Sequence, residues 1–444
     1  MPGERNGHVG FARAMEGGPW QACGVRSSAA AIEMNPGALS AELPRLLYVG
    51  DVPVECSYHG SALLYRLLQK YPVDRLRIIE AGLQASRPDR RLKAVSYNFS
   101  PLPFTRLKNT RFSRWYSAAN LVLAAGRVEK IEALIGNNKP QAVLSVTHGI
   151  SWITAAEFAR KHDLPLHLIC HDEWIAFPGT LPLVRKRMDN IFGFHYRKAA
   201  SRLCVSPSMI ESYQRRYGTG ATLLYPSREI DASVSADTPE RLKQPERGLV
   251  FAYAGSLNSA GYRQALRLLG ECLKPLGGKL LIFGPSTPEE ADREYPNIYW
   301  QGLVDAKELI SRLRQEADVL FVPMSFAEED RPNMEISFPS KLTDYTAVGL
   351  PLLIYGPAYC SAIRWARENP GVAETVDGEG RAQLSMAVEK LAHHPEYLIK
   401  LGEGAVEAGE RFFSHRDAWQ IFQNALLNFA AKPNQPAAMP HLAI

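Results

Sequence analysis

Short apolar runs alternate with amphipathic stretches along most of the chain. In the first half, the apolar runs that predict strands are RLLYVG, LRIIE, QAVLSVT, PLHLIC, RLCVS and ATLLY. The apolar spacing between most of them is typical of helices, over SALLYRLLQKY and residues 111–135, 152–162, 183–199 and 207–217. This alternation predicts βαβ units and a parallel sheet.

The same alternation starts again after a polar stretch, residues 226–247, which is rich in Ser, Asp, Glu and Pro. The strands expected beyond it are LVFAYAG, KLLIFG, NIYWQG, DVLFVP and LPLLIYG. The helices expected there are 263–272, 306–315, 341–348, 382–408 and 417–431. We therefore predict an α/β protein with two Rossmann-like domains that face a cleft.

The domain boundaries follow from these runs. The predicted parts are an extension without regular structure over 1–43, a first domain over 44–225, a linker over 226–247, a second domain over 248–408, a terminal helix over 409–431 and a tail over 432–444. A chain of 444 residues also favours two cores, because single cores rarely grow beyond about 250–300 residues.

Composition and charge describe an ordinary globular chain, with 46% hydrophobic and 22% charged residues. The net charge of +5 is compatible with a nucleotide, an anionic acceptor or an anionic membrane face, and a solvated surface explains it equally well. We expect no secretory signal, because the first twenty residues contain no continuous apolar stretch. We also expect no membrane span, because no apolar run reaches about 18 residues. The six cysteines form no C-x-x-C pair, and we expect a reducing, cytoplasmic environment.

The segment FPSKLTDYTAVGLPLLIYGP, residues 338–357, carries the clearest chemistry. Ser340 predicts an N-cap, and the N-terminus of the helix that follows is a site for anions. Lys341 adds a cation there, and the Asp344 carboxylate, one turn further, can accept hydrogen bonds from two ribose hydroxyls. The helix therefore predicts a site for the phosphate and ribose of a nucleotide. An ordinary capped helix with a surface lysine and aspartate is the alternative.

This segment resembles the second domain of GT-B glycosyltransferases, especially family 4 and its relatives. Those sequences combine a similar helix start, an acid, a small-residue turn and Gly-x-Pro before a β run, matched here by SKLTDYTAVGLPLLIY. Further matches, in the family's order, are VSPSMIESYQRRYG, YAGSL, NIYWQGLVDAKELISRLRQEADVLFVPMS and RFFSHRDAW. The resemblance covers most of the chain from Arg45 onward. It implies retaining sugar transfer from a nucleoside diphosphate sugar, and a C-terminal helix that crosses back to the first domain.

The resemblance also implies where the donor lies. The acid that holds the ribose falls on Asp344, whereas the first acid of the family's Glu-x7-Glu pair falls on Ile336, which cannot replace it. Glu335 is the expected substitute. Other acids of the same loop are alternatives, namely Glu328, Glu329 and Asp330.

For the diphosphate, the resemblance points to Lys341 and Arg263. Arg263 is the candidate replacement for an arginine that the family often has directly after the glycine of its first second-domain strand, where this chain has Ser256 after Gly255. Both cations are expected to stabilise the departing diphosphate. The other residues expected at the donor are Gly255, Ser256, Gly302, Leu303, Val304, Ser340, Leu342 and Thr343.

In the first domain, the loop that faces the donor phosphates in the family corresponds to Tyr58, His59, Gly60 and Ser61, with His59 expected on the acceptor side. His171, at the end of the run LHLICHDEW, matches a histidine that contacts the donor sugar. A structural histidine is the alternative. Asp172 and Glu173 are expected to contact the acceptor, and a loop without such a role is the alternative.

The stretch RLKNTRFSRWY, residues 106–116, interleaves basic and aromatic side chains. It predicts peripheral contact with an anionic membrane or a lipid-linked acceptor, and a solvated helix face is the alternative. Arg185, Lys186 and Arg187 favour the same contact with less support. From the family's habits we expect surface-glycan or lipid-linked saccharide assembly, with a small-molecule acceptor left open and no nucleic-acid partner.

We expect no metal and no other cofactor, because the chain lacks an Asp-x-Asp motif, a Walker loop and an H-E-x-x-H motif. Two alternatives to a glycosyltransferase remain. One is a nucleotide-sugar 2-epimerase with the same two-domain fold. The other is a noncatalytic nucleotide-sugar-binding partner of a glycan assembly complex, which Ile336 and Ser256 keep open.

Overall fold

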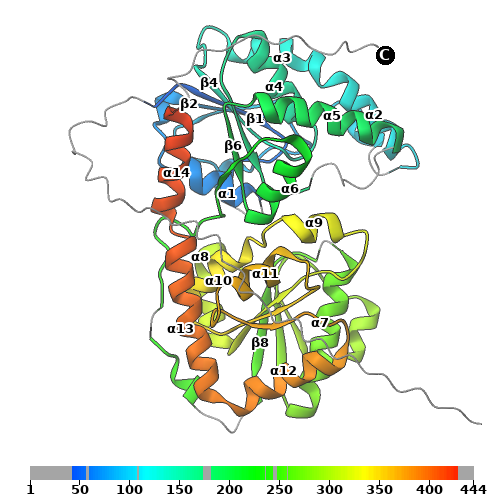
Figure 1. Ribbon diagram of the computed structural model, residues 1–444, viewed down its shortest axis with the longest axis vertical. Helices are drawn as coiled ribbons and strands as arrows, with labels where there is room; N and C mark the ends of the chain where they lie inside the picture. The colour runs from blue at the N-terminus through cyan, green and yellow to red at the C-terminus, as the bar shows by residue number, and fades with distance from the viewer. Residues whose placement is uncertain are drawn as a thin grey trace, which may run out of the picture. The chain divides into compact units, whose positions relative to one another are not determined.

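The computed structural model describes residues 43–428 except 57–59, 108–109, 174–181, 236, 244–247 and 258 (Figure 1). Tyr58 and His59 lie outside the described residues, as do nearly all of the predicted N-terminal extension and the whole predicted tail. Within the described part, no helix is both long and apolar enough to cross a membrane.

The first sheet consists of parallel strands in the order β3-β2-β1-β4-β5-β6-β7. Their bounds are β1 Leu46–Gly50, β2 Leu76–Glu80, β3 Ser96–Phe99, β4 Ala142–Val146, β5 Leu166–Cys170, β6 Ser201–Cys204 and β7 Thr222–Leu223. The predicted strands are confirmed, and β3 is an addition. The sequence SYNF of β3 has no apolar run because this edge strand is half-buried or exposed along its length.

The helices of this half are α1 Gly60–Leu68, α2 Ser113–Leu123, α3 Val128–Ile135, α4 Ser151–Lys161, α5 Pro182–Lys198 and α6 Pro207–Tyr217. The single helix predicted over 111–135 is wrong, because a 3₁₀ turn, Ala125–Arg127, separates α2 from α3. The buried Arg127 guanidinium explains the break, since it donates hydrogen bonds to the carbonyl oxygens of Ala81 and Ser100.

The second sheet has the order β10-β9-β8-β11-β12-β13, again parallel. Its bounds are β8 Val250–Ala254, β9 Lys279–Phe283, β10 Ile298–Gly302, β11 Val319–Pro323, β12 Leu352–Tyr355 and β13 Glu374–Val376. The five predicted strands are confirmed. The three-residue β13 was not predicted, because its sequence ETV is too short to form an apolar run.

The helices of the second half are α7 Ala260–Leu273, α8 Ala306–Glu316, α9 Arg331–Ile336, α10 Lys341–Val348, α11 Ser361–Glu368, α12 Arg381–His393, α13 Pro395–Phe412 and α14 His415–Leu427. The helix predicted over 382–408 is wrong in one respect. It is divided at Pro395, which starts α13, because proline fits the first turn of a helix but not its interior. Helices α9 and α11 were not predicted.

Both sheets are buried, which explains why their strands are continuous apolar runs. Every residue of β1, β4, β5, β11 and β12 is buried. Parallel strands covered by helices on both faces have no solvent-facing side that would need polar residues. The prediction of two Rossmann-like sheets is therefore confirmed. We call them, with their helices, the first lobe (β1–β7) and the second lobe (β8–β13).

The C-terminal helices connect the two lobes, as the resemblance implied. Helix α13 packs on α10 of the second lobe, and α14 packs on α1 of the first (Figure 1). The Nε2 atom of His415, at the start of α14, lies 2.8 Å from the carbonyl oxygen of Arg66 in α1. The rings of Trp419 and Tyr71 meet edge to face at 6.3 Å.

Two buried side chains make contacts near the boundary between the lobes: Ser206 joins the first lobe to the second, and Arg228 joins the segment between the sheets to the second lobe. The Ser206 hydroxyl accepts a hydrogen bond from the Met209 amide, which caps α6, and donates one to the carbonyl oxygen of Ile336 in the second lobe. The Arg228 guanidinium donates to the Thr346 carbonyl oxygen at 2.7 Å and pairs with Glu410 at 2.6 Å. These contacts hold the chain where it passes from one sheet to the other.

We predict that Ser206→Ala lowers the free energy of unfolding by about 1–2 kcal/mol, because it removes an N-cap and a buried hydrogen bond. Denaturant unfolding monitored by circular dichroism measures this change. Ser311→Ala, on an exposed helix position, is the control and should stay within about 0.5 kcal/mol of the parent. Equal free energies of unfolding for the two variants would contradict the stabilising role of the Ser206 hydroxyl.

Candidate functional site

A hollow of about 1310 Å³ is lined by residues from both lobes. Side chains and backbone that follow the carboxyl ends of the strands face it, in agreement with the usual position of ligands in open α/β sheets. The residues in such positions include Asp51 after β1, His148 after β4, His171 after β5, Gly255 after β8, Gly284 after β9 and Met324 after β11. We call this hollow the cleft.

The start of α10 lies at the cleft, but Ser340 does not cap it as predicted. Ser340 has a helical backbone, and its side chain makes no capping hydrogen bond. The amide of Thr343 and its hydroxyl both donate to the Ser340 carbonyl oxygen. Ser340 lines the cleft, and its side chain does not cap the helix. Leu342 and Thr343, predicted at the donor, are buried and do not line it.

Lys341 lies between two aromatic rings. Its Nζ atom is 4.7 Å from the ring centroid of Tyr253 and 5.4 Å from that of Tyr262. Burial lowers the pKa of Lys341 from 10.5 to about 8. The two rings stabilise the cation, and burial reduces its hydration. An anion that enters the cleft would therefore interact strongly with this ammonium group.

Asp344 is paired across the lobes. Its carboxylate oxygens lie 3.0 and 3.2 Å from the Nη2 atom of Arg66, which belongs to α1 of the first lobe. Arg66 also donates to the Ser227 carbonyl oxygen at 2.6 Å and lies 3.8 Å from Glu229. A ribose at Asp344 would therefore share the carboxylate with Arg66. Sequence reasoning missed Arg66, whose one signal was a charge within the apolar helix SALLYRLL.

His148, His171 and Asp172 form a hydrogen-bonded group at the ends of the adjacent strands β4 and β5. The Nε2 atom of His171 is 3.2 Å from Nδ1 of His148, and an oxygen of Asp172 is 3.3 Å from each of these nitrogens. Gly60 allows this arrangement, because a Cβ atom there would lie 2.4 Å from the Cε1 atom of His171. Gly60 and Ser61 line the cleft beside it.

The three groups differ in protonation. Burial lowers the pKa of His171. Burial alone would also lower the pKa of His148, but the hydrogen bond and charge of Asp172 outweigh it and raise that pKa. Burial alone would raise the pKa of Asp172, whereas His171 and His148 bring it below its ordinary value. His171 is thus held as a neutral imidazole, which can donate one hydrogen bond and accept another.

Within the described part of the chain, the same three side chains form a group that could bind a metal ion. One ligand atom from each lies within 4.8 Å of the others, and two imidazoles with a carboxylate are typical of zinc sites. Their mutual hydrogen bonds already account for the arrangement. That the protein needs no metal stays a prediction.

Asn333, on α9, reaches the cleft and was not predicted. Its side-chain oxygen accepts a hydrogen bond from the Glu173 amide at 3.1 Å, and its side chain also bonds Asp172. Glu173, predicted on the acceptor side, is buried and pairs with Arg216 at 2.8 Å. It does not line the cleft, whereas Asp172 does.

Two predicted donor residues are not brought to the cleft. The Arg263 guanidinium lies 2.6 Å from Asp292 and 3.1 Å from Glu289, outside the residues that line it. Glu335 does not line it either, because α9 turns Asn333 and Met334 to that side. In this arrangement neither Arg263 nor Glu335 lines the cleft, and their contact with a donor stays a prediction.

The remaining predicted donor residues lie at strand ends. Gly255, Ser256, Leu303 and Val304 line the cleft, while Gly302, at the end of β10, does not. Gly255 packs closely against the next strand end, since a Cβ atom on Gly284 would lie 2.2 Å from the Gly255 carbonyl oxygen. Leu303 is half-exposed and offers an apolar surface at the rim.

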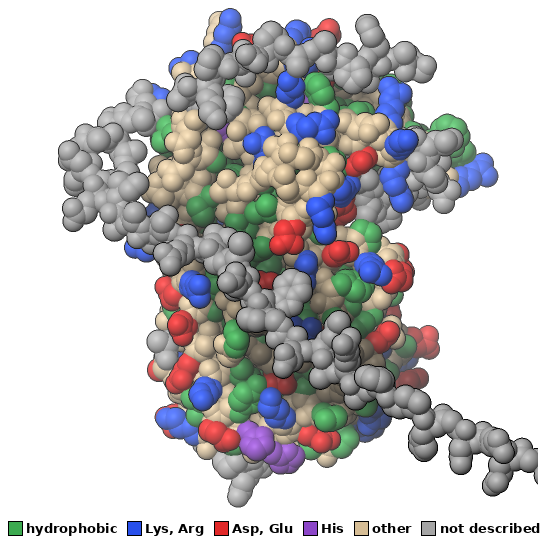
Figure 2. All heavy atoms as spheres, viewed as in Figure 1, with side chains coloured by type: hydrophobic (Ala, Val, Ile, Leu, Met, Phe, Trp, Pro, Cys, Tyr) green, Lys and Arg blue, Asp and Glu red, His purple; other side chains and the backbone are tan. Residues whose placement is uncertain are grey.

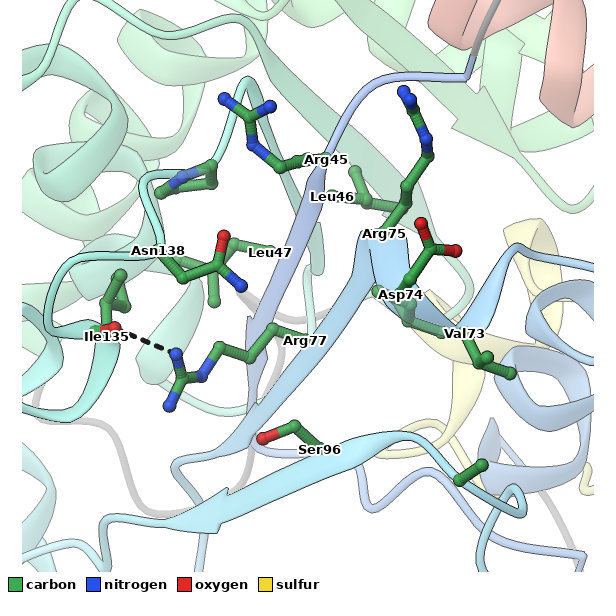
Figure 3. A pocket seen from close by; sticks show the side chains of 13 residues that line it. Arg45, Leu46, Leu47, Val73, Asp74, Arg75, Arg77, Ser96, Ile135 and Asn138 are labelled. Atoms are coloured by element: carbon green, nitrogen blue, oxygen red, sulfur yellow. Dashed lines mark hydrogen bonds between the residues drawn. The ribbon is translucent and has the colours of Figure 1, made fainter.

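A second cavity, of about 230 Å³, lies at the opposite ends of the first-lobe strands (Figure 3). Its arginines do not converge on a common point, and each donates a hydrogen bond to a backbone carbonyl. In Figure 3 the side chains of Arg45, Arg75 and Arg77 point in different directions, and the hydrogen bond drawn joins Arg77 to Ile135. The cleft remains the candidate site.

No protein-family model matches the sequence, and no similar sequence is found among curated proteins. The structure resembles HepE of Anabaena in complex with UDP and glucose, with 13% identity, a TM-score of 0.60, and 86% of this chain and 99% of that chain covered. For sucrose-phosphate synthase from Thermosynechococcus elongatus the values are 15%, 0.64, 87% and 100%. For the UDP-forming α,α-trehalose-phosphate synthase from Burkholderia vietnamiensis they are 14%, 0.61, 88% and 98%. The protein therefore has the GT-B fold that the sequence resemblance implied.

Proposed function

We propose that the protein is a glycosyltransferase that moves a sugar from a nucleoside diphosphate sugar to an acceptor with retention of anomeric configuration. The observation that carries the proposal is that Lys341 and Asp344, on one helix, line the same cleft as His171 and its hydrogen-bonded partners. A cation for phosphate, a carboxylate for ribose and a neutral imidazole for sugar hydroxyls are the contacts that such a donor needs.

Lys341 would stabilise the charge that develops on the departing diphosphate, assisted by the Ser340 hydroxyl. Its interaction strengthens as the sugar–phosphate bond breaks, which is the requirement for lowering the barrier. Arg263 has no part in this proposal, because its guanidinium is held by acids away from the cleft.

Residues at the boundary between the two lobes would hold the sugar and the acceptor. His171 can exchange hydrogen bonds with sugar hydroxyls, and Asn333 takes the place that sequence reasoning gave to an acid of the α9 segment. Asp172 faces the acceptor side. In the proposed step the acceptor attacks from the face that the diphosphate leaves, and the leaving phosphate accepts the acceptor's proton. Retention of configuration follows from attack on that face.

The acceptor is proposed to be a growing saccharide, surface-bound or lipid-linked, in glycan assembly. The similar solved structures include complexes with UDP, so UDP-sugars are the first donors to test. Leu303 and Val304 would contact the base at the rim of the cleft.

The experiment that tests the proposal is a thermal-shift panel of UDP, GDP, ADP, TDP and CMP and their sugar conjugates, with and without EDTA. We expect one nucleoside diphosphate to raise the melting temperature, with the shift unchanged by EDTA. A shift lost with EDTA would overturn metal independence, and no shift with any nucleotide would overturn the donor site.

The two alternative functions are separated by products. A 2-epimerase would convert the stabilising donor to free nucleotide and a new sugar without any acceptor. A noncatalytic partner would bind the donor without turnover over a broad acceptor set. A transferase gives an acceptor-dependent product, whose anomeric configuration nuclear magnetic resonance reads directly.

We predict that Asp344→Ala raises the dissociation constant of the stabilising nucleotide about ten- to hundredfold, because two ribose hydroxyls lose a charged partner worth about 1.5–3 kcal/mol. Isothermal titration calorimetry measures the change. Asp377→Asn, outside the cleft, is the control, and a melting scan checks the fold after loss of the Arg66 pair. Unchanged affinity with an intact fold would refute the ribose role.

Nucleotide affinity should fall as the pH rises through about 8. Below that pH Lys341 is protonated and attracts the diphosphate. Above it Lys341 is mostly neutral, so binding of the diphosphate requires that Lys341 first take up a proton, which weakens the observed affinity. The dissociation constant then rises by up to about tenfold per pH unit. Lys341→Met should weaken binding at pH 7 and remove the dependence, whereas Lys279→Met, at an exposed position, should keep it. A dependence that survives Lys341→Met would exclude this residue as its source.

A further inference from the structure

One segment holds much of the protein's exposed apolar surface. Among the described residues, thirteen large hydrophobic side chains are exposed, and six of them fall between positions 104 and 123. We call these six the apolar patch, namely Phe104, Leu107, Phe112, Trp115, Val122 and Leu123. Trp115 is 66% exposed and Val122 71%. Scattered exposed apolar residues are normal, but a concentration of this kind marks an interaction site.

Helix α2 is apolar on two faces. Tyr116 and Leu121 are buried against the first lobe, so they supply the packing that the fold requires. Trp115 and Val122 are seven residues apart and therefore share a face, which is exposed. Folding does not account for this second face, because the helix already buries its first.

The charged residues in the segment that carries the patch are of one sign. Residues 104–123 include four Arg and Lys residues and no Asp or Glu. Arg106 and Arg111 are exposed within the patch, and the Arg111 guanidinium lies 5.0 Å from the ring centroid of Phe112. Figure 2 shows hydrophobic and basic side chains next to one another at the upper right, where Figure 1 places α2.

We propose that the apolar patch, with Arg106 and Arg111, binds the anionic face of a lipid bilayer. Tryptophan and phenylalanine interleaved with arginine are typical of elements that lie in the headgroup region, where the rings enter the apolar boundary and the guanidinium groups meet lipid phosphates. The absence of acidic residues along this part of the sequence favours an anionic surface over a protein partner of mixed charge. Arg185, Lys186 and Arg187, exposed at the start of α5, add positive charge.

This surface is separate from the cleft residues that carry the proposed function. None of the six patch residues lines the cleft. Membrane binding can therefore be measured without donor, acceptor or turnover, and its failure would leave the glycosyltransferase proposal untouched.

The test is flotation of the full chain with vesicles of phosphatidylcholine alone and of phosphatidylcholine mixed with phosphatidylglycerol. We expect binding to the mixed vesicles only, weakened by added salt because exposed charges are screened. Arg106→Glu with Arg111→Glu, and separately Trp115→Ala with Val122→Ala, should each weaken binding about tenfold or more. The matched controls are Arg87→Glu with Arg416→Glu and Met386→Ala, all at exposed positions outside the patch, and they should bind like the parent.

Depth of insertion gives a second readout. Vesicles with brominated acyl chains should quench tryptophan fluorescence in the parent, and Trp115→Phe should lose most of that quenching while it still binds. Three results would overturn the proposal: no binding to mixed vesicles, equal binding by patch and control variants, or a parent that self-associates in gel filtration through the patch while patch variants stay monomeric. Melting scans confirm that each variant is folded.

Discussion

The geometry of the cleft depends on Arg66. Its guanidinium bonds the Ser227 carbonyl oxygen and the Asp344 carboxylate, and its own carbonyl oxygen is bonded by His415. Through its side chain and its backbone carbonyl, this one buried residue joins α1, the segment between the sheets, α10 and α14. Because a buried charge is stable only with its partners in place, these elements are held together as a set. The proposed ribose carboxylate is thus also part of the contact between lobes, so nucleotide binding and lobe position are physically linked.

The two sides of the cleft differ in the charge of the side chain that each presents. Lys341 is a cation placed against aromatic rings with little water, which favours an incoming anion. His171 is a neutral imidazole inside a hydrogen-bonded group, which suits hydroxyl groups better than phosphates. For the proposed function, this division favours the diphosphate at the second lobe and the sugar at the boundary with the first. The difference follows from the burial of Lys341 and His171 and from the groups that contact each of them, not from the number of charges in the cleft.

The first lobe carries both the His171 group and the proposed membrane surface. A bilayer that binds the apolar patch would fix the lobe that faces the acceptor, whereas the second lobe, with Lys341, would remain in contact with the donor in solution. This arrangement suits an acceptor that is anchored in the membrane and a donor that diffuses freely.

Local sequence determined the two α/β lobes and helix α10, because apolar periodicity and the Gly and Pro positions act over a few residues. It also identified Lys341, Asp344 and His171 as cleft residues, since strand ends and helix starts meet at one edge of a parallel sheet. Tertiary structure alone decided which charges were already satisfied. Arg263 is held by acids away from the cleft, and Arg66 meets Asp344 from 278 positions away. Such pairings depend on how distant elements pack, which no local pattern in a single sequence records.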